Sequence, residues 1–99
     1  MVNTITVTQT FVGLTEEGNK IYNVHASAKG DASSAAIAIP VTKLRKIRGL
    51  PGMAITLDDQ VAPAYMVSET ISGTTITVTV NAVVENNKYV EVAGEVIGI

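Results

Sequence analysis

The sequence predicts a small all-β domain, an antiparallel β-sandwich or barrel of about seven strands with one short helical turn. Val, Ile and Thr, which are stiff at χ1 and suit pleated strands, make up more than a third of the 99 residues. Apolar and polar side chains alternate with a period of two over several short stretches, and turn-forming residues separate these stretches. Because the chain is short and contains no linker, we expect one domain over residues 1–99.

The clearest strands are residues 4–12 and 74–80, in which threonine alternates with apolar side chains. Further strands are expected over 20–28, 35–39, 53–57, 64–71 and 89–99, with hairpin-type turns such as Thr15–Asn19 and Glu85–Lys88 between them. The side chains expected to be largely buried follow from this spacing: Ile5, Val7, Phe11, Val24, Leu44, Ile47, Ile76, Val78, Val80, Val90 and Val92.

One segment, Val41–Gly49, departs from the β pattern. Thr42 is a candidate N-cap, Leu44 and Ile47 are three residues apart, and Gly49 is a candidate helix end. We therefore expect one or two turns of helix here, followed by a turn at residues 50–52.

The composition predicts that part of the surface is covered by other subunits. Only 16% of residues are charged, against about 25% in ordinary soluble domains, while 46% are hydrophobic. A small domain exposes much surface per residue, so we expect a homo-oligomer, in which the apolar C-terminal strand would otherwise be an exposed edge. The alternative is that Thr and Ser cover the surface. No signal peptide or membrane span is evident, and no membrane partner is expected.

No residue pattern of catalysis, cofactor binding or metal binding is found, so we expect no enzymatic activity. His25 is the only histidine and falls on the polar side of its strand, where a solvated side chain without a plausible partner is expected. Asp58 and Asp59 are adjacent and lack further ligands at calcium-loop spacing, so they indicate a turn. There are no cysteines.

Four of the seven basic residues fall within six positions, in a chain of net charge −2: Lys43, Arg45, Lys46 and Arg48. One interpretation is a docking patch for an acidic partner surface or for phosphate. The other is the solvated side of a short helix whose Leu44 and Ile47 fill the core. No aromatic residue interleaves the cluster, and nucleic acid is not an expected partner.

Four segments follow one another along the chain: the loop Gly30–Ala32, the strand Ala36–Pro40, the segment Leu44–Gly49 and the stretch Gly73–Thr79. In these segments the layout resembles the small decoration or cement proteins of tailed-bacteriophage virions. This resemblance implies a non-enzymatic virion structural protein that decorates or cements a phage capsid, contacts capsid or other virion subunits, and is assembled in the host cytoplasm. A small binding module that uses the Lys43–Arg48 patch to recognise a ligand or polyanion is the alternative function.

Overall fold

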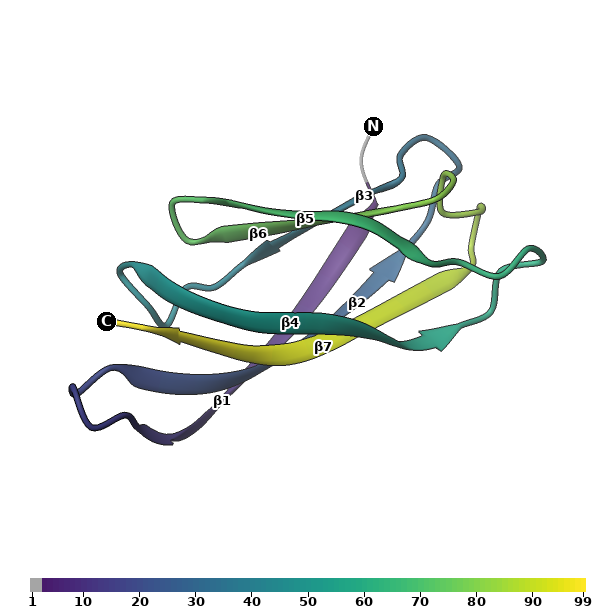
Figure 1. Ribbon diagram of the computed structural model, residues 1–99. Helices are drawn as coiled ribbons and strands as arrows, with labels where there is room; N and C mark the ends of the chain where they lie inside the picture. Colours follow the sequence, from purple (N-terminus) through teal and green to yellow (C-terminus); the bar gives the residue numbers. More distant parts are fainter. Residues whose placement is uncertain (1–2) are drawn as a thin grey trace.

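The computed structural model describes residues 3–99, apart from the side chain of Pro51. These residues form seven strands in two packed sheets (Figure 1). They contain no helix, and hence no helix that could cross a membrane. The strands are β1 (Thr4–Leu14), β2 (Lys20–Lys29), β3 (Ala36–Pro40), β4 (Ile47–Asp58), β5 (Met66–Ser72), β6 (Thr75–Val80) and β7 (Tyr89–Gly98). The predicted all-β fold is thus confirmed.

The two sheets differ in length. The long sheet has the strand order β1-β2-β7-β4, with strands of 10 to 12 residues. The short sheet has the order β3-β6-β5, with strands of 5 to 7 residues. All pairings are antiparallel, and β3 lies against β1 while β5 lies against β4. The domain is therefore a sandwich, and its pairing is that of a jelly roll from which one hairpin is missing.

The last strand, β7, lies inside the long sheet. It pairs with β2 on one side and with β4 on the other. Val96 is completely buried and Ile97 half-buried. The expectation that this apolar strand forms an exposed edge was therefore wrong, because an edge cannot be recognised without the strand order.

The core fills the space between the sheets. Of the residues predicted to be there, Val24, Leu44, Ile47, Ile76, Val78, Val80, Val90 and Val92 are buried, and Ile5 and Val7 are half-buried against them. Phe11 is 53% exposed, so its predicted burial was wrong. Side chains that the prediction left out complete the core: Ala26, Ala28, Ile37, Ile39, Val41, Met53, Val84 and Val96.

The helix expected over Val41–Gly49 does not form. Residues 41–46 connect β3 to β4, with a single turn in which the Leu44 N–H donates to the Val41 carbonyl at 3.4 Å. The strand β4 then begins at Ile47 and runs without a break to Asp58, so the turn expected at residues 50–52 was also wrong. Pro51 and Gly52 instead fall at a shift in the register with β7, where Gly52 has a φ of +142°. The backbone of Lys46 pairs with Ile99 in both directions, which a helix would prevent.

Candidate functional site

The structure places all four predicted docking residues on the surface at one end of the sandwich. We call Lys43, Arg45, Lys46 and Arg48 the basic cluster; the first three lie on the β3–β4 connection and Arg48 is in β4. All four are exposed, and within residues 3–99 none has a carboxylate within 4.0 Å. The remaining residues have three Lys or Arg against nine Asp or Glu, so the cluster is a local positive region on an acidic molecule.

The β3–β4 connection that carries the cluster is held at several points. Val41 and Leu44 are buried, so the connection is fixed from below by two core side chains. The side chain of Gln9 on β1 accepts from the Lys43 N–H at 3.0 Å and donates to the Thr42 hydroxyl at 2.9 Å. The cationic side chains therefore extend from a backbone with a fixed conformation, which lowers the entropy cost of binding a partner.

The same end contains Gly98, whose lack of a side chain lets the connection approach β7. A Cβ at this position would lie 2.0 Å from the Lys46 carbonyl oxygen and 3.0 Å from a Leu44 methyl carbon. The main-chain oxygen of Ile99 accepts from the N–H groups of Arg45 and Lys46. The position of the basic cluster therefore depends on contacts made some 50 residues later in the chain.

Beside the basic cluster, the β1–β2 hairpin extends beyond the short sheet (Figure 1). We call residues 11–22 the hairpin arm. The strands of the long sheet exceed those of the short sheet by about five residues, or roughly 16 Å at ~3.3 Å per residue, so this part has no covering layer. Phe11 and Leu14 are consequently 53% and 63% exposed, and Val12, at the register shift between Phe11 and Gly13, is 50% exposed. The low content of charged residues predicted apolar surface that this domain does not cover itself. The alternation of apolar and polar residues did not indicate where that surface lies.

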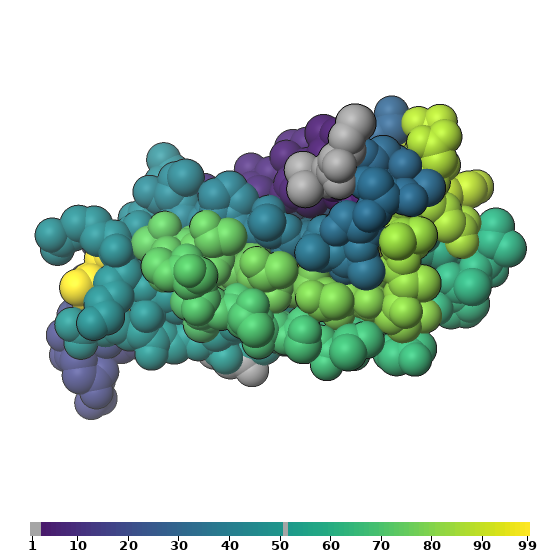
Figure 2. Space-filling view, turned by 90° about the horizontal axis from the view of Figure 1, so that it is seen from above, coloured from purple at the N-terminus to yellow at the C-terminus, as the bar shows by residue number. Residues whose placement is uncertain are grey.

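The opposite end of the molecule carries a second group of exposed apolar side chains, which we call the far-end patch. It lies on and beside the β4–β5 connection, at the right of Figures 1 and 2. Its large members are Leu57, Val61, Tyr65, Val67 and Val83, and the most exposed is Val61 at 84%. The sequence analysis predicted a turn at the start of this connection, at Asp58 and Asp59.

The β4–β5 connection is also ordered by hydrogen bonds to its backbone. The carboxylate of Asp58 accepts from the N–H groups of Gln60 and Ala64 at 3.0 and 2.6 Å. Glu85 accepts from the Val61 N–H at 3.1 Å, and Asp59 accepts from the Tyr89 N–H. Asp58 thus acts as the acceptor of the predicted turn, whereas Asp59 joins the connection to the start of β7.

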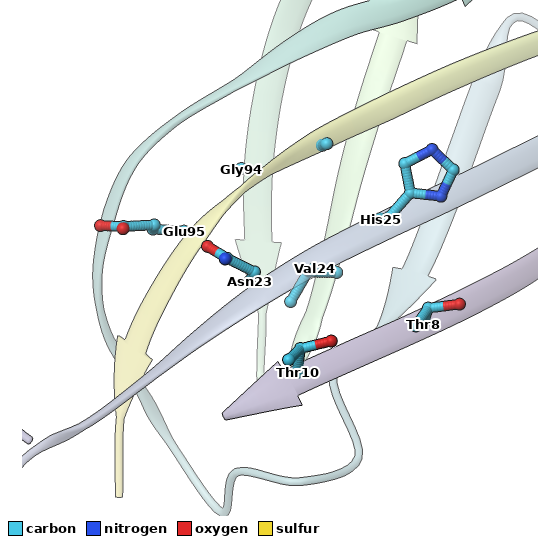
Figure 3. A pocket seen from close by; sticks show the side chains of 8 residues that line it. Thr8, Thr10, Asn23, Val24, His25, Gly94 and Glu95 are labelled. Atoms are coloured by element: carbon cyan, nitrogen blue, oxygen red, sulfur yellow. The ribbon is translucent and has the colours of Figure 1, made fainter. Parts of the chain in front are cut away.

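The outer side of the long sheet has a shallow hollow of about 390 Å³. Figure 3 shows Thr8 and Thr10 on β1, Asn23 and His25 on β2, and Glu95 on β7 around it. Asn23 and Glu95 are register partners across β2 and β7. The hollow is lined by the flat outer surface of three strands, so it offers polar groups but little enclosure for a small ligand.

His25 lies on this outer surface, as predicted, but it is not without a partner. Its Nε2 is 2.9 Å from a carboxylate oxygen of Glu91, and the side chains are 46% and 25% exposed. The expectation that His25 lacks a plausible partner was wrong, because the β2–β7 register pairs Ser27 with Glu91 and so brings together residues distant in sequence. Within the described residues, no group of three His, Asp or Glu side chains is arranged to hold a metal ion.

Comparison with known proteins adds no further guide to function. No protein-family model, curated protein or solved structure matches the chain. The functional argument therefore rests on the surfaces described above.

Proposed function

We propose that this chain is a non-enzymatic structural protein of a virion, which decorates or cements a bacteriophage capsid by joining neighbouring subunits. One observation carries the proposal: exposed large apolar side chains gather at both ends of an elongated domain. The molecule measures 43 × 22 × 20 Å, with the hairpin arm at one end and the far-end patch at the other (Figures 1 and 2).

Exposed apolar groups at two separate places suit a protein that bridges two partners. Grouped apolar surface is typical of binding sites, whereas single exposed apolar side chains are ordinary. A rigid sandwich that buries one end on each of two subunits stabilises the assembled state by mass action, because it binds that state and not the separate subunits. This role needs no catalytic group and little net charge.

The strand pairing offers an architectural analogy. Jelly rolls occur in viral capsid proteins and also in lectins, so the shared architecture is an analogy and not evidence of function. It is compatible with a virion protein that is assembled in the host cytoplasm.

Binding to capsid shells tests this function. Purified protein is mixed with empty shells of the phage whose genome encodes the chain, and the mixture is sedimented. We expect the protein to sediment with the shells and to raise their melting temperature, and we expect V61S/Y65S to weaken this binding. A protein that stays in the supernatant and leaves shell melting unchanged would overturn the proposal.

A polyanion-binding module is the second candidate function, and the unpaired basic cluster favours it. If all four cations contact phosphate or sulfate groups, the logarithm of the binding constant should fall with the logarithm of salt concentration with a slope of about −3 to −4. Heparin titration at several salt concentrations measures the slope, and K43A/R45A should reduce it by about 2. Absence of binding at low salt would eliminate this candidate.

A further inference from the structure

We propose that the hairpin arm is the contact surface between two copies of this chain, arranged around a two-fold axis. The inference rests on the proposed assembly role and assigns one of its contacts to a second copy of the chain. Two copies joined at their arms would then bridge two capsid subunits through their two far-end patches. The arm of one copy thus packs against the arm of the other. Apolar side chains form the centre of this contact, and charged groups lie at both of its borders.

The apolar centre lies on the inner side of the arm. Phe11 and Tyr22 are register partners, and their rings meet edge to face with centroids 5.5 Å apart. Tyr22 pairs in turn with buried Val96, which places this pair on the core side of the long sheet. Leu14 pairs with Lys20, Lys20 pairs with Gly98, and Gly98 pairs with the buried Ile47. Because paired residues point to the same side of a sheet, Leu14 is on the core side as well. Because no strand of the short sheet extends this far, these side chains form an uncovered continuation of the core.

The borders of this surface have opposite charges. On the side towards the core is the basic cluster, since Lys43 is fixed to Gln9 on β1, two residues before Phe11. At the tip is the Thr15–Asn19 turn with Glu16 and Glu17, both exposed and without a cation within 4.0 Å among the described residues. Lys20 is the one cation at the tip, so the two glutamates leave the tip with a net negative charge.

This arrangement is complementary to itself. In a two-fold contact, if a residue of the first copy touches a given residue of the second, the same pair of residues also meets with the two copies exchanged. Gln9 and Leu14 are about 16 Å apart along the strand. A two-fold axis near the middle of the arm therefore places each acidic tip against the partner's basic cluster. The apolar centres then cover each other. An anionic lipid surface fits less well, because it would repel the acidic tip that reaches it first.

Charge exchange between two variants gives a direct test. In E16K/E17K both borders of the arm are basic, and in K43E/R45E/K46E, which leaves Arg48 as the cation of the cluster, both are acidic. Each variant alone should therefore remain monomeric by analytical ultracentrifugation at concentrations where the wild-type chain is a dimer. An equimolar mixture should form a heterodimer, because each acidic border then meets a basic one. All altered side chains are exposed, and thermal melts verify that both variants are folded.

The apolar centre is tested by F11S/L14S, with V61S/Y65S at the far end as the matched control. We expect at least a tenfold rise in the dimer dissociation constant for the arm variant and none for the control. Dimerisation of both charge variants alone, or failure of their mixture to associate, would overturn the arm contact. A monomeric wild-type chain at ~100 μM would do the same. The shell-sedimentation result is independent of these outcomes, so the arm contact can fail while the capsid role stands.

Discussion

Replacing Val78 with alanine tests the core at the central strand of the short sheet. Val78 has no exposed surface and lies in this strand, β6, where its register partners are Ile37 on β3 and Glu69 on β5. The substitution removes two methyl groups. At ~0.8 kcal/mol per buried carbon this is about 1.6 kcal/mol of lost burial, and the cavity left behind raises the cost to roughly 2–3 kcal/mol.

The effect should be large on the scale of this domain. One kcal/mol shifts the melting temperature of a domain of this size by about 4–8 °C, so we expect Val78→Ala to melt roughly 10–20 °C below the parent. Urea unfolding followed by circular dichroism gives the free energy. Both proteins are measured at one concentration, because any self-association adds to apparent stability.

Val67 provides the matched control. It is the same residue type in the neighbouring strand β5, but 62% exposed, so Val67→Ala should change the free energy of unfolding by no more than about 0.5 kcal/mol. If Val78→Ala and Val67→Ala unfold at the same urea concentration as the parent, Val78 does not belong to the core and the placement of the short sheet is wrong.

Three other substitutions test local features. Gly98→Ala should lower the free energy of unfolding in urea by about 1–3 kcal/mol, because its Cβ would overlap the Lys46 carbonyl. Gly13→Ala, which has open space around it, should be nearly neutral. Equal losses for the two variants would contradict the close packing at Gly98. His25→Ala should change stability by less than about 0.5 kcal/mol, since its pair with Glu91 is half-exposed, and a loss above 1 kcal/mol would show that the pair is structural. The Ser33 hydroxyl and N–H donate to Asp31 and lower the pKa of its carboxyl group. The stabilisation from ionised Asp31 is present above the ordinary pKa of Asp and is lost as pH falls through the lowered pKa; Ser33→Ala should raise the pKa measured by NMR titration, and an unchanged value would exclude the hydroxyl hydrogen bond as its main cause.

Strand existence and the inward faces were predictable because they depend on local alternation. Residues 75–80 show this best: Ile76, Val78 and Val80 are buried and the threonines between them are not. Phe11 marks the limit of the rule. It pairs with the partly buried Tyr22 and so has the inward orientation that alternation predicts, but burial also needs a covering layer. The length of that layer is set by other strands.

The segment after Pro40 was misassigned because two different structures give the same spacing. Leu44 and Ile47 are both buried, as an i, i+3 pattern predicts, but Leu44 reaches the core from a connection and Ile47 from the first residue of a strand. What selects this structure is pairing with Ile99, far along the chain. The contact between His25 and Glu91 was hidden for the same reason, since it depends on the β2–β7 register.

The interior position of β7 also constrains the order in which the chain can fold. The β1–β2 and β5–β6 hairpins join neighbouring strands and can form from local contacts. By contrast, β4 has no partner in the long sheet until β7, some 30 residues later, is available to lie between it and β2. During synthesis on the ribosome the long sheet therefore remains incomplete until its last strand emerges, and until then the inner edge of β2 is free to pair with other chains. Such non-local pairing predicts folding on the millisecond-to-second scale that is typical of β-sandwiches.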